Sequence, residues 1–180
     1  MSRTQDPLSV EYILLGLIHE RPIYAYDLYK KISSDKDLNT VWKFNQSQIY
    51  AVLDKIERNK LIQAKITAGA AYPFRKVYSL TEEGEIRFQT WKVTPVEHAN
   101  AVRSDFMAKL YFLNQEPEDV FKKALSGQIE KSQEWLAWFQ KLQRETSPEE
   151  TYLRMVYGYR IQSIEMIISW LNNCLLERKG

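Results

Sequence analysis

The sequence is short of the residue types that build disulfides and metal sites. It contains one cysteine, Cys174, and two histidines, His19 and His98. One cysteine cannot form an intramolecular disulfide, and these three residues are too few to supply the ligands of a structural zinc site. We therefore expect no metal and no cofactor.

Long hydrophobic runs are also missing. No stretch approaches the ~20 consecutive apolar residues that span a bilayer, and residues 1–7 contain no apolar signal core. With 44% hydrophobic and 27% charged residues, the composition fits an ordinary globular protein. We expect a soluble, cytoplasmic chain.

The chain also lacks the signatures of an enzyme. It has no glycine-rich phosphate loop, no set of metal ligands and no nucleophile with a plausible base. Its functional residues are therefore expected to bind a partner rather than to catalyse a reaction.

The chain as a whole has little excess of positive over negative charge, but one region of it has such an excess. The formal net charge is only +2. Residues 40–80 nevertheless contain seven basic and two acidic residues, whereas residues 96–180 contain eleven basic and twelve acidic ones. A short region rich in basic side chains is typical of a surface that contacts phosphates.

Two helices are predicted in the first 33 residues. Apolar residues recur at helical spacing over residues 8–18 and stop before Pro22, which cannot continue a helix. Residues 25–33 form the second helix, because their apolar residues are three and four apart. Residues 34–40 are interpreted as a polar loop.

A third helix is predicted over residues 46–58, with Asn45 as its N-cap. The apolar residues of this helix recur at three and four and should face the core: Ile49, Val52, Leu53 and Ile56. The opposite face is polar, small and basic: Gln46, Ser47, Gln48, Ala51, Asp54, Lys55 and Arg58.

A hairpin and a fourth helix follow. Residues 61–67 and 76–80 have the partial alternation of strands and are joined by a long tip at residues 68–73. Thr81 should cap the next helix. Three helices, a hairpin and a helix are the order of a winged helix-turn-helix, which we assign to residues 1–95 as a DNA-binding domain.

The second half, residues 96–180, is predicted to be entirely helical. The break at Val93-Thr94-Pro95 separates it from the first half. Helices are expected over residues 101–113 and 117–145, and a last one should begin after Ser147 as its cap.

The last helix carries two apolar faces. One, here called the seam, has spacings that alternate between four and three, as in a coiled coil: Tyr157, Ile161, Ile164, Ile168, Leu171 and Leu175. The other comprises Tyr152, Val156, Tyr159, Met166, Trp170 and Cys174. The preceding helix can cover only one face, so we predict a homodimer with an antiparallel, coiled-coil-like dimerisation domain and assign the seam to dimerisation. The whole fold is therefore predicted to be mainly α.

The N-terminal end of the third helix is where base reading is expected. Amide and hydroxyl side chains can read donor and acceptor patterns in the major groove, so Gln46, Ser47 and Gln48 are the candidate base readers, with Ala51 on the same face. The candidate contacts to the DNA backbone are Tyr50, Lys55, Lys65, Arg75 and Lys76, with Tyr26 as a weaker one.

Simpler interpretations stay open for several of these residues. The polar residues could form an ordinary solvated helix face, and Arg75 and Lys76 could only protect a strand edge. The aromatic cluster Trp135, Trp138, Phe139 and Trp170 could be core or could line an effector pocket. Cys174 could be a redox sensor or an inert apolar residue. The alternative to a DNA-binding regulator is a protein-interaction module with little DNA binding of its own.

The sequence resembles the PadR family of transcriptional regulators. Four segments carry the resemblance: LIHERPIYAYDL at residues 17–28, SQIYAVLDKIE at 47–57, LI at 61–62 and RKVYSLTEEG at 75–84. The segment VRSDFMAKL at residues 102–110 is similar to the long-form, AphA-like members, whose extra helices form a dimerisation arm. This resemblance implies a dimer that binds an inverted repeat in double-stranded DNA, usually as a repressor.

The resemblance also assigns residues and shows two departures. It places the family's DNA-contacting tyrosine at Tyr50 and its wing bases at Arg75 and Lys76. Glycines usual in the family are replaced by Ala25 and by Lys60, so we expect a different chain conformation after the third helix. Family inducers are small molecules, and none can be assigned to this chain.

Overall fold

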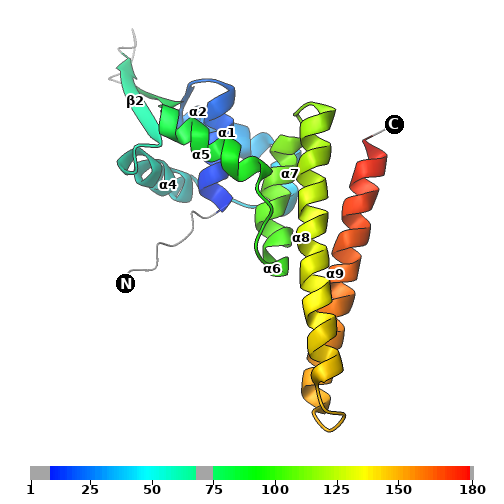
Figure 1. The fold of residues 1–180 in the computed structure, drawn as a ribbon. Coiled ribbons are helices and arrows are strands. Elements are labelled where there is room, and N and C mark those ends of the chain that lie inside the picture. Colours follow the sequence, from blue (N-terminus) through cyan, green and yellow to red (C-terminus); the bar gives the residue numbers. More distant parts are fainter. Residues whose placement is uncertain (1–8, 68–74, 179–180) are drawn as a thin grey trace. The chain divides into compact units, whose positions relative to one another are not determined.

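The computed structural model describes residues 9–67 and 75–178, and it divides into two compact units (Figure 1). The first unit comprises Met1–Lys92 and Met107–Phe112, and the second comprises Val93–Phe106 and Leu113–Gly180. The domain boundary after residue 95 stays a prediction, and in the structure Met107–Phe112 packs with the first unit.

The first unit has the predicted order of helices and hairpin, so the mainly α fold with a winged helix-turn-helix is confirmed. Its elements are α1 (Ser9–Glu20), β1 (Ile23–Tyr24), α2 (Ala25–Ser34), α3 (Lys36–Val41), α4 (Gln46–Arg58), β2 (Ile62–Thr67), β3 (Arg75–Leu80), α5 (Glu82–Val93) and most of α7 (Met107–Leu113). The strands form an antiparallel sheet in the order β1-β3-β2. The wing is the β2-β3 pair, and its tip at residues 68–74 lies outside the described residues.

Two short elements of the first unit differ from the prediction. The prediction of a loop at residues 34–40 is wrong, because α3 occupies most of this segment. The Asp35 carboxylate caps α3 by accepting hydrogen bonds from the backbone amides of Asp37 and Leu38, and the Leu38 side chain is fully buried. The strand β1 was not expected either. It is only two residues long and pairs with β3, with Ile23 opposite Tyr78.

The core of the first unit confirms which face of α4 is buried. Ile49, Leu53 and Ile56 have no exposed surface, and Val52 is half-buried at the edge of the same cluster. A ring of aromatic contacts closes the other end of this core, where Phe88 of α5 meets the edge of Phe112 of α7 at 5.1 Å between ring centroids. The outer face of α4 is therefore held outward by the packing of its inner face.

α4 ends in a left-handed backbone conformation that usually requires glycine, although the residue at this position is Lys60. The Leu61 amide donates to the Ile56 carbonyl and the Lys60 amide donates to the Glu57 carbonyl, which are the paired bonds of a Schellman motif. Lys60 adopts a φ of 59°. The expectation of a different helix ending here is wrong, and the chain accepts a left-handed lysine instead.

The end of the wing is tied to the end of α4 at the Leu61 carbonyl. The backbone amide of Thr81 donates to this oxygen at 3.1 Å, and the Thr81 hydroxyl is shared between the Lys60 carbonyl at 2.7 Å and the Leu61 carbonyl at 3.1 Å. The same hydroxyl caps α5 by accepting from the Gly84 amide, which confirms Thr81 as the cap. A Cβ at Gly84 would lie 1.9 Å from the Leu61 carbonyl oxygen, so only glycine fits this approach.

The second unit contains three short helical pieces and two long helices. These are α6 (Ala99–Ala101), the π-helical turn η1 (Val102–Phe106), the end of α7, α8 (Glu118–Glu145) and α9 (Thr151–Glu177). Ser147 does not cap α9, which begins four residues later, and the Ser147 amide instead donates to the Glu150 carboxylate. Over the described ranges, no helix combines the length and the apolar character needed to cross a membrane.

The seam of α9 packs inside the chain. α8 and α9 lie side by side (Figure 1), and Tyr157 packs against Phe139 of α8 at 6.1 Å between ring centroids. Ile164 and Leu171 have no exposed surface in the single chain. The prediction that these two residues contact a second chain is therefore wrong, because α8 already covers them. The dimerisation role of the other four stays a prediction: Tyr157, Ile161, Ile168 and Leu175.

Replacing Lys60 by glycine should stabilise the first unit. A left-handed conformation costs a non-glycine residue roughly 1–2 kcal/mol, part of which glycine loses again through its greater freedom in the unfolded chain. We expect Lys60→Gly to raise the free energy of unfolding by about 1 kcal/mol, measured by urea denaturation at one protein concentration. The exposed Asn59→Gly change next to it is the control and should not stabilise. Equal or lower stability of Lys60→Gly would contradict the helix ending described above.

Candidate nucleic-acid interface

The outer face of α4 is open to solvent in the first unit. All five residues predicted on its N-terminal part are exposed: Gln46, Ser47, Gln48, Tyr50 and Ala51. Asn45 caps the helix as predicted, because its side-chain oxygen accepts from the Gln48 amide at 2.9 Å. The assignment of these residues to DNA contact stays a prediction, and their exposure is what such a contact requires.

Gln48 has a second task that the sequence reading missed. Its side-chain oxygen accepts a hydrogen bond from the Asn45 amide at 3.0 Å, which completes a capping box. The amide nitrogen of the side chain remains available as a donor. Any contact of Gln48 to a base is therefore oriented by the helix cap.

Lys55 is held by a buried acid rather than pointing freely to solvent. Its ammonium lies 2.5 Å from the carboxylate of Glu11 on α1, and the Glu11 side chain is only 2% exposed. This pair joins α4 to α1 inside the first unit. Lys55 therefore fixes the position of α4 relative to α1, and the sequence signal for this pair is Glu11, an acid within the apolar run of α1.

Lys76 also has an acidic partner. Its ammonium lies 3.2 Å from the carboxylate of Glu57 on α4. The hydrogen bond to Glu57 raises the pKa of Lys76 above its ordinary value, with the negative field of the nearby acids adding to it. Two of the seven basic residues counted in this region are thus paired with acids, so its free positive charge is smaller than the sequence suggests.

The remaining predicted contacts lie on the wing and on α2. Lys65 of β2 is exposed. The backbone of Arg75 begins β3, whereas its side chain lies outside the described residues. Tyr26 is 58% exposed at the start of α2, so it is not core.

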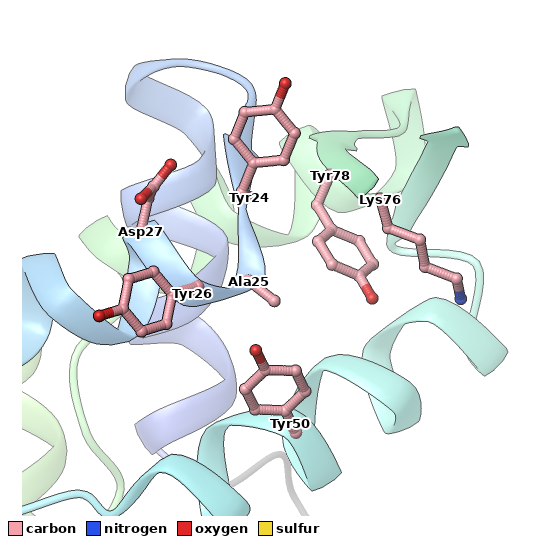
Figure 2. Close-up of a pocket in the computed structure, with 7 residues that line it drawn as sticks. All are labelled: Tyr24, Ala25, Tyr26, Asp27, Tyr50, Lys76 and Tyr78. Atoms are coloured by element: carbon pink, nitrogen blue, oxygen red, sulfur yellow. The ribbon is translucent and has the colours of Figure 1, made fainter. Parts of the chain in front are cut away.

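A pocket of about 500 Å³ lies between the start of α2, the middle of α4 and β3 (Figure 2). It brings together two predicted contact residues, Tyr50 and Lys76, with Tyr78, which the sequence reading did not single out. Figure 2 shows the hydroxyl groups of Tyr50 and Tyr78 pointing into the same space beside Ala25, whereas the Tyr26 ring points away from it. The other lining residues are Tyr24 and Asp27.

The aromatic cluster of the second unit splits into two parts. Trp135, Trp138 and Phe139 line a cavity of about 280 Å³ together with Arg160. Trp170 instead packs edge-on against Phe106 at 6.2 Å between ring centroids. Three of the four residues are therefore placed as an effector pocket would need, and the fourth is packing.

Cys174 sits half-buried on α9. Burial raises the pKa of its thiol, and the nearby Glu177 carboxylate raises it further. A raised pKa leaves little thiolate at neutral pH and lowers reactivity. Among the residues that the structure describes, no group of three or more potential ligands could hold a metal ion.

These features define the class of protein: a winged helix-turn-helix in which α4 has an exposed polar face beside a wing of β2 and β3. Residues 14–90 match the transcriptional regulator PadR-like family, and residues 102–177 match the family described as virulence activator alpha C-term. The chain therefore contains a PadR-like domain followed by a virulence activator alpha C-term domain, and it is a DNA-binding transcriptional regulator.

One curated relative and two solved structures illustrate the similarity. The negative transcriptional regulator PadR of Bacillus subtilis (strain 168) is 27% identical over 143 residues, covering 77% of this chain and 78% of that protein. The crystal structure of Bacillus subtilis PadR in complex with operator DNA has 24% identity and a TM-score of 0.47, covering 96% of this chain and 99% of that one. A PadR-like regulator of Bacillus cereus has 25% identity and a TM-score of 0.43, covering 98% and 99%.

Removing Lys55 should destabilise the first unit. Lys55→Ala leaves the Glu11 carboxylate buried without its partner, which typically costs a few kcal/mol, and the partial exposure of Lys55 reduces that cost. We expect a loss of about 2 kcal/mol in urea denaturation. The double variant Glu11→Leu, Lys55→Met replaces the pair by apolar side chains and should recover most of the loss. If Lys55→Ala unfolds at the wild-type urea concentration, the pair does not hold α4.

Proposed function

We propose that this regulator binds double-stranded DNA as a homodimer, with α4 of each chain in the major groove and the wing on the adjacent phosphates. The observation that carries the proposal is the exposed polar face at the start of α4, where Gln46, Ser47 and Gln48 stand at the positive end of the helix. These three side chains read bases, and Ala51 lets the helix approach closely.

The backbone contacts come from the residues around this face. Lys65, Arg75 and Lys76 on the wing and Tyr50 on α4 reach phosphate oxygens and position the protein without specifying sequence. Tyr26 adds a contact from α2. Lys55 takes a different role from the one predicted, because its pair with Glu11 makes it a positioning residue.

The dimer forms through an exposed stripe on α9. Tyr152, Met155, Tyr159 and Met166 recur along one side of this helix and are 77%, 68%, 67% and 62% exposed. Exposed apolar surface of this extent on one helix is typical of a protein contact. A second copy of the same chain covers it, and the two-fold symmetry then presents two α4 helices to one duplex.

Binding leads to repression at the promoter that contains the site, in the cytoplasm where the DNA is. The support is the Bacillus subtilis relative, which is a negative transcriptional regulator. A small-molecule effector, where one acts, binds the cavity of the second unit, since its tryptophan rings and the Arg160 guanidinium suit a flat, negatively charged molecule.

DNA binding should depend steeply on salt. Purified protein is used to select duplex fragments from its source genome, and affinity for the best fragment is measured by fluorescence polarisation. If about six phosphates are neutralised, affinity should fall roughly a thousandfold between 50 and 200 mM salt. A flat response, or no selected fragment, would instead favour the protein-interaction module, which docks onto another regulator with little DNA contact.

Matched variants separate base reading from backbone contact. Gln48→Glu keeps the acceptor that completes the capping box and loses the side-chain donors, so it should change the preferred sequence. Lys65→Ala should weaken binding to all sequences alike. Equal losses on every sequence for Gln48→Glu would remove Gln48 from the base readers.

A charge in the exposed stripe should separate the dimer. Met166→Glu would place a carboxylate in the proposed interface, where burial of an unpaired charge is strongly unfavourable. We expect mainly single chains in analytical ultracentrifugation at micromolar concentration, with unchanged helical content. The control, Asn172→Glu, adds the same charge on an exposed part of α9 outside the stripe and should leave a dimer. Dimers of Met166→Glu would exclude the stripe as the interface.

A further inference from the structure

The pocket between α2, α4 and β3 is built from groups that favour an anion. Tyr50 comes from α4, Lys76 and Tyr78 come from β3, and the first residues of α2 close the third side (Figure 2). The hydroxyl groups of Tyr50 and Tyr78 thus point into one space from two elements that are far apart in the sequence, whereas the Lys76 ammonium lies to one side of it, beside Glu57. All three can donate hydrogen bonds to an oxygen anion.

Tyr78 is the unusual member of this group. Its side chain is only 4% exposed, and its hydroxyl points into the pocket (Figure 2). That hydroxyl makes no hydrogen bond to any residue that the structure describes. Burial raises the pKa of Tyr78, so its hydroxyl keeps its proton and stays a donor. Because this hydroxyl opens into the pocket, its proton is available to an acceptor that comes from outside the chain.

The start of α2 offers further donors to the same space. Its N-cap residue is Tyr24, whose side chain makes no capping hydrogen bond to the helix. The backbone amides of the first turn therefore receive no side-chain acceptor from the N-cap, and the positive end of the helix dipole faces outward. Ala25, which lies at the pocket, keeps this end accessible because its side chain is small.

The acids near the pocket set the conditions for binding. Lys76 is shared with Glu57, so an incoming anion must compete for its ammonium. Asp54 and Glu57 also act on Tyr78 through their charges. The carboxylate of Asp27 lines the pocket but points away from the Tyr50 and Tyr78 hydroxyls (Figure 2). An anion is therefore best placed between the two tyrosines and the start of α2.

We propose that this pocket seats one phosphate of the DNA backbone, with the buried Tyr78 hydroxyl, Tyr50 and the α2 amides as donors and Lys76 turning from Glu57 towards it. The inference rests on the proposed DNA binding and adds Tyr78 as a contact hidden from the protein surface. The pocket lies beside the exposed face of α4, so a phosphate flanking the bases read by α4 is the one it receives. Its volume leaves room for the sugar attached to that phosphate.

The test combines one atom removed from the protein with one charge removed from the DNA. Tyr78→Phe deletes only the hydroxyl, and the control Tyr29→Phe deletes a hydroxyl in the same unit outside the pocket. Each protein is titrated with the best selected duplex and with a set of copies in which a single phosphate is replaced by a neutral methylphosphonate. Thermal unfolding of both variants is recorded alongside.

The expected results are specific to a bound phosphate. Tyr78→Phe should bind the unmodified duplex about tenfold more weakly while unfolding at the wild-type temperature or higher, because the lost hydroxyl has no partner in the free protein. One methylphosphonate position per half-site should cost the wild type about tenfold and Tyr78→Phe less than about twofold, since the two changes remove the same contact. Tyr29→Phe should behave as the wild type throughout.

Other outcomes overturn the inference. Wild-type affinity of Tyr78→Phe, or a loss that adds fully to every methylphosphonate, would show that the pocket holds no phosphate while DNA binding itself stands. Failure of the wild-type protein to bind any duplex would instead refute the proposed function, so the two failures are distinguishable.

Discussion

The proposed DNA-binding surface depends on one close contact at the Leu61 carbonyl. This oxygen accepts a hydrogen bond from the Thr81 amide and leaves no room for a side chain on Gly84. Leu61 follows the end of α4 and Thr81 follows the end of β3. This contact therefore fixes the position of α4 relative to the wing. A helix in the groove and a wing on the phosphates can reach one duplex together only if their relative position is fixed in advance.

The fold was predictable from the sequence wherever buried apolar residues recur at a regular spacing. The inner face of α4 is predictable because residues three and four apart repeat along it, and the same holds for the seam of α9. β1 has two residues and therefore no period, and α3 is signalled only by Asp35 within a polar stretch. A regular spacing of apolar residues shows that a helix face is buried but not what covers it. The sequence therefore could not show that Ile164 is covered by α8 rather than by a second chain.

The candidate site was predictable in its exposed residues and not in its partners. Charge counted along the chain identifies the basic region, but Glu11 lies 44 residues from Lys55 and its pairing appears only in three dimensions. The pairing of Glu57 with Lys76 and the place of Tyr78 in the pocket likewise appear only in the structure. The result is a surface whose cations are partly held by acids, so its attraction for nucleic acid is moderated, which favours selective over indiscriminate binding.

The pairing of α8 with α9 has a consequence for how the active species is assembled. Because these helices bury their shared apolar residues within one chain, each newly made polypeptide can fold as a monomer before it dimerises. The proposed dimer then forms by association of two folded monomers, and the fraction of dimer depends on the concentration of the protein in the cell. A cell that makes few copies would hold mostly single subunits, and promoter occupancy would rise more than in proportion as synthesis increases.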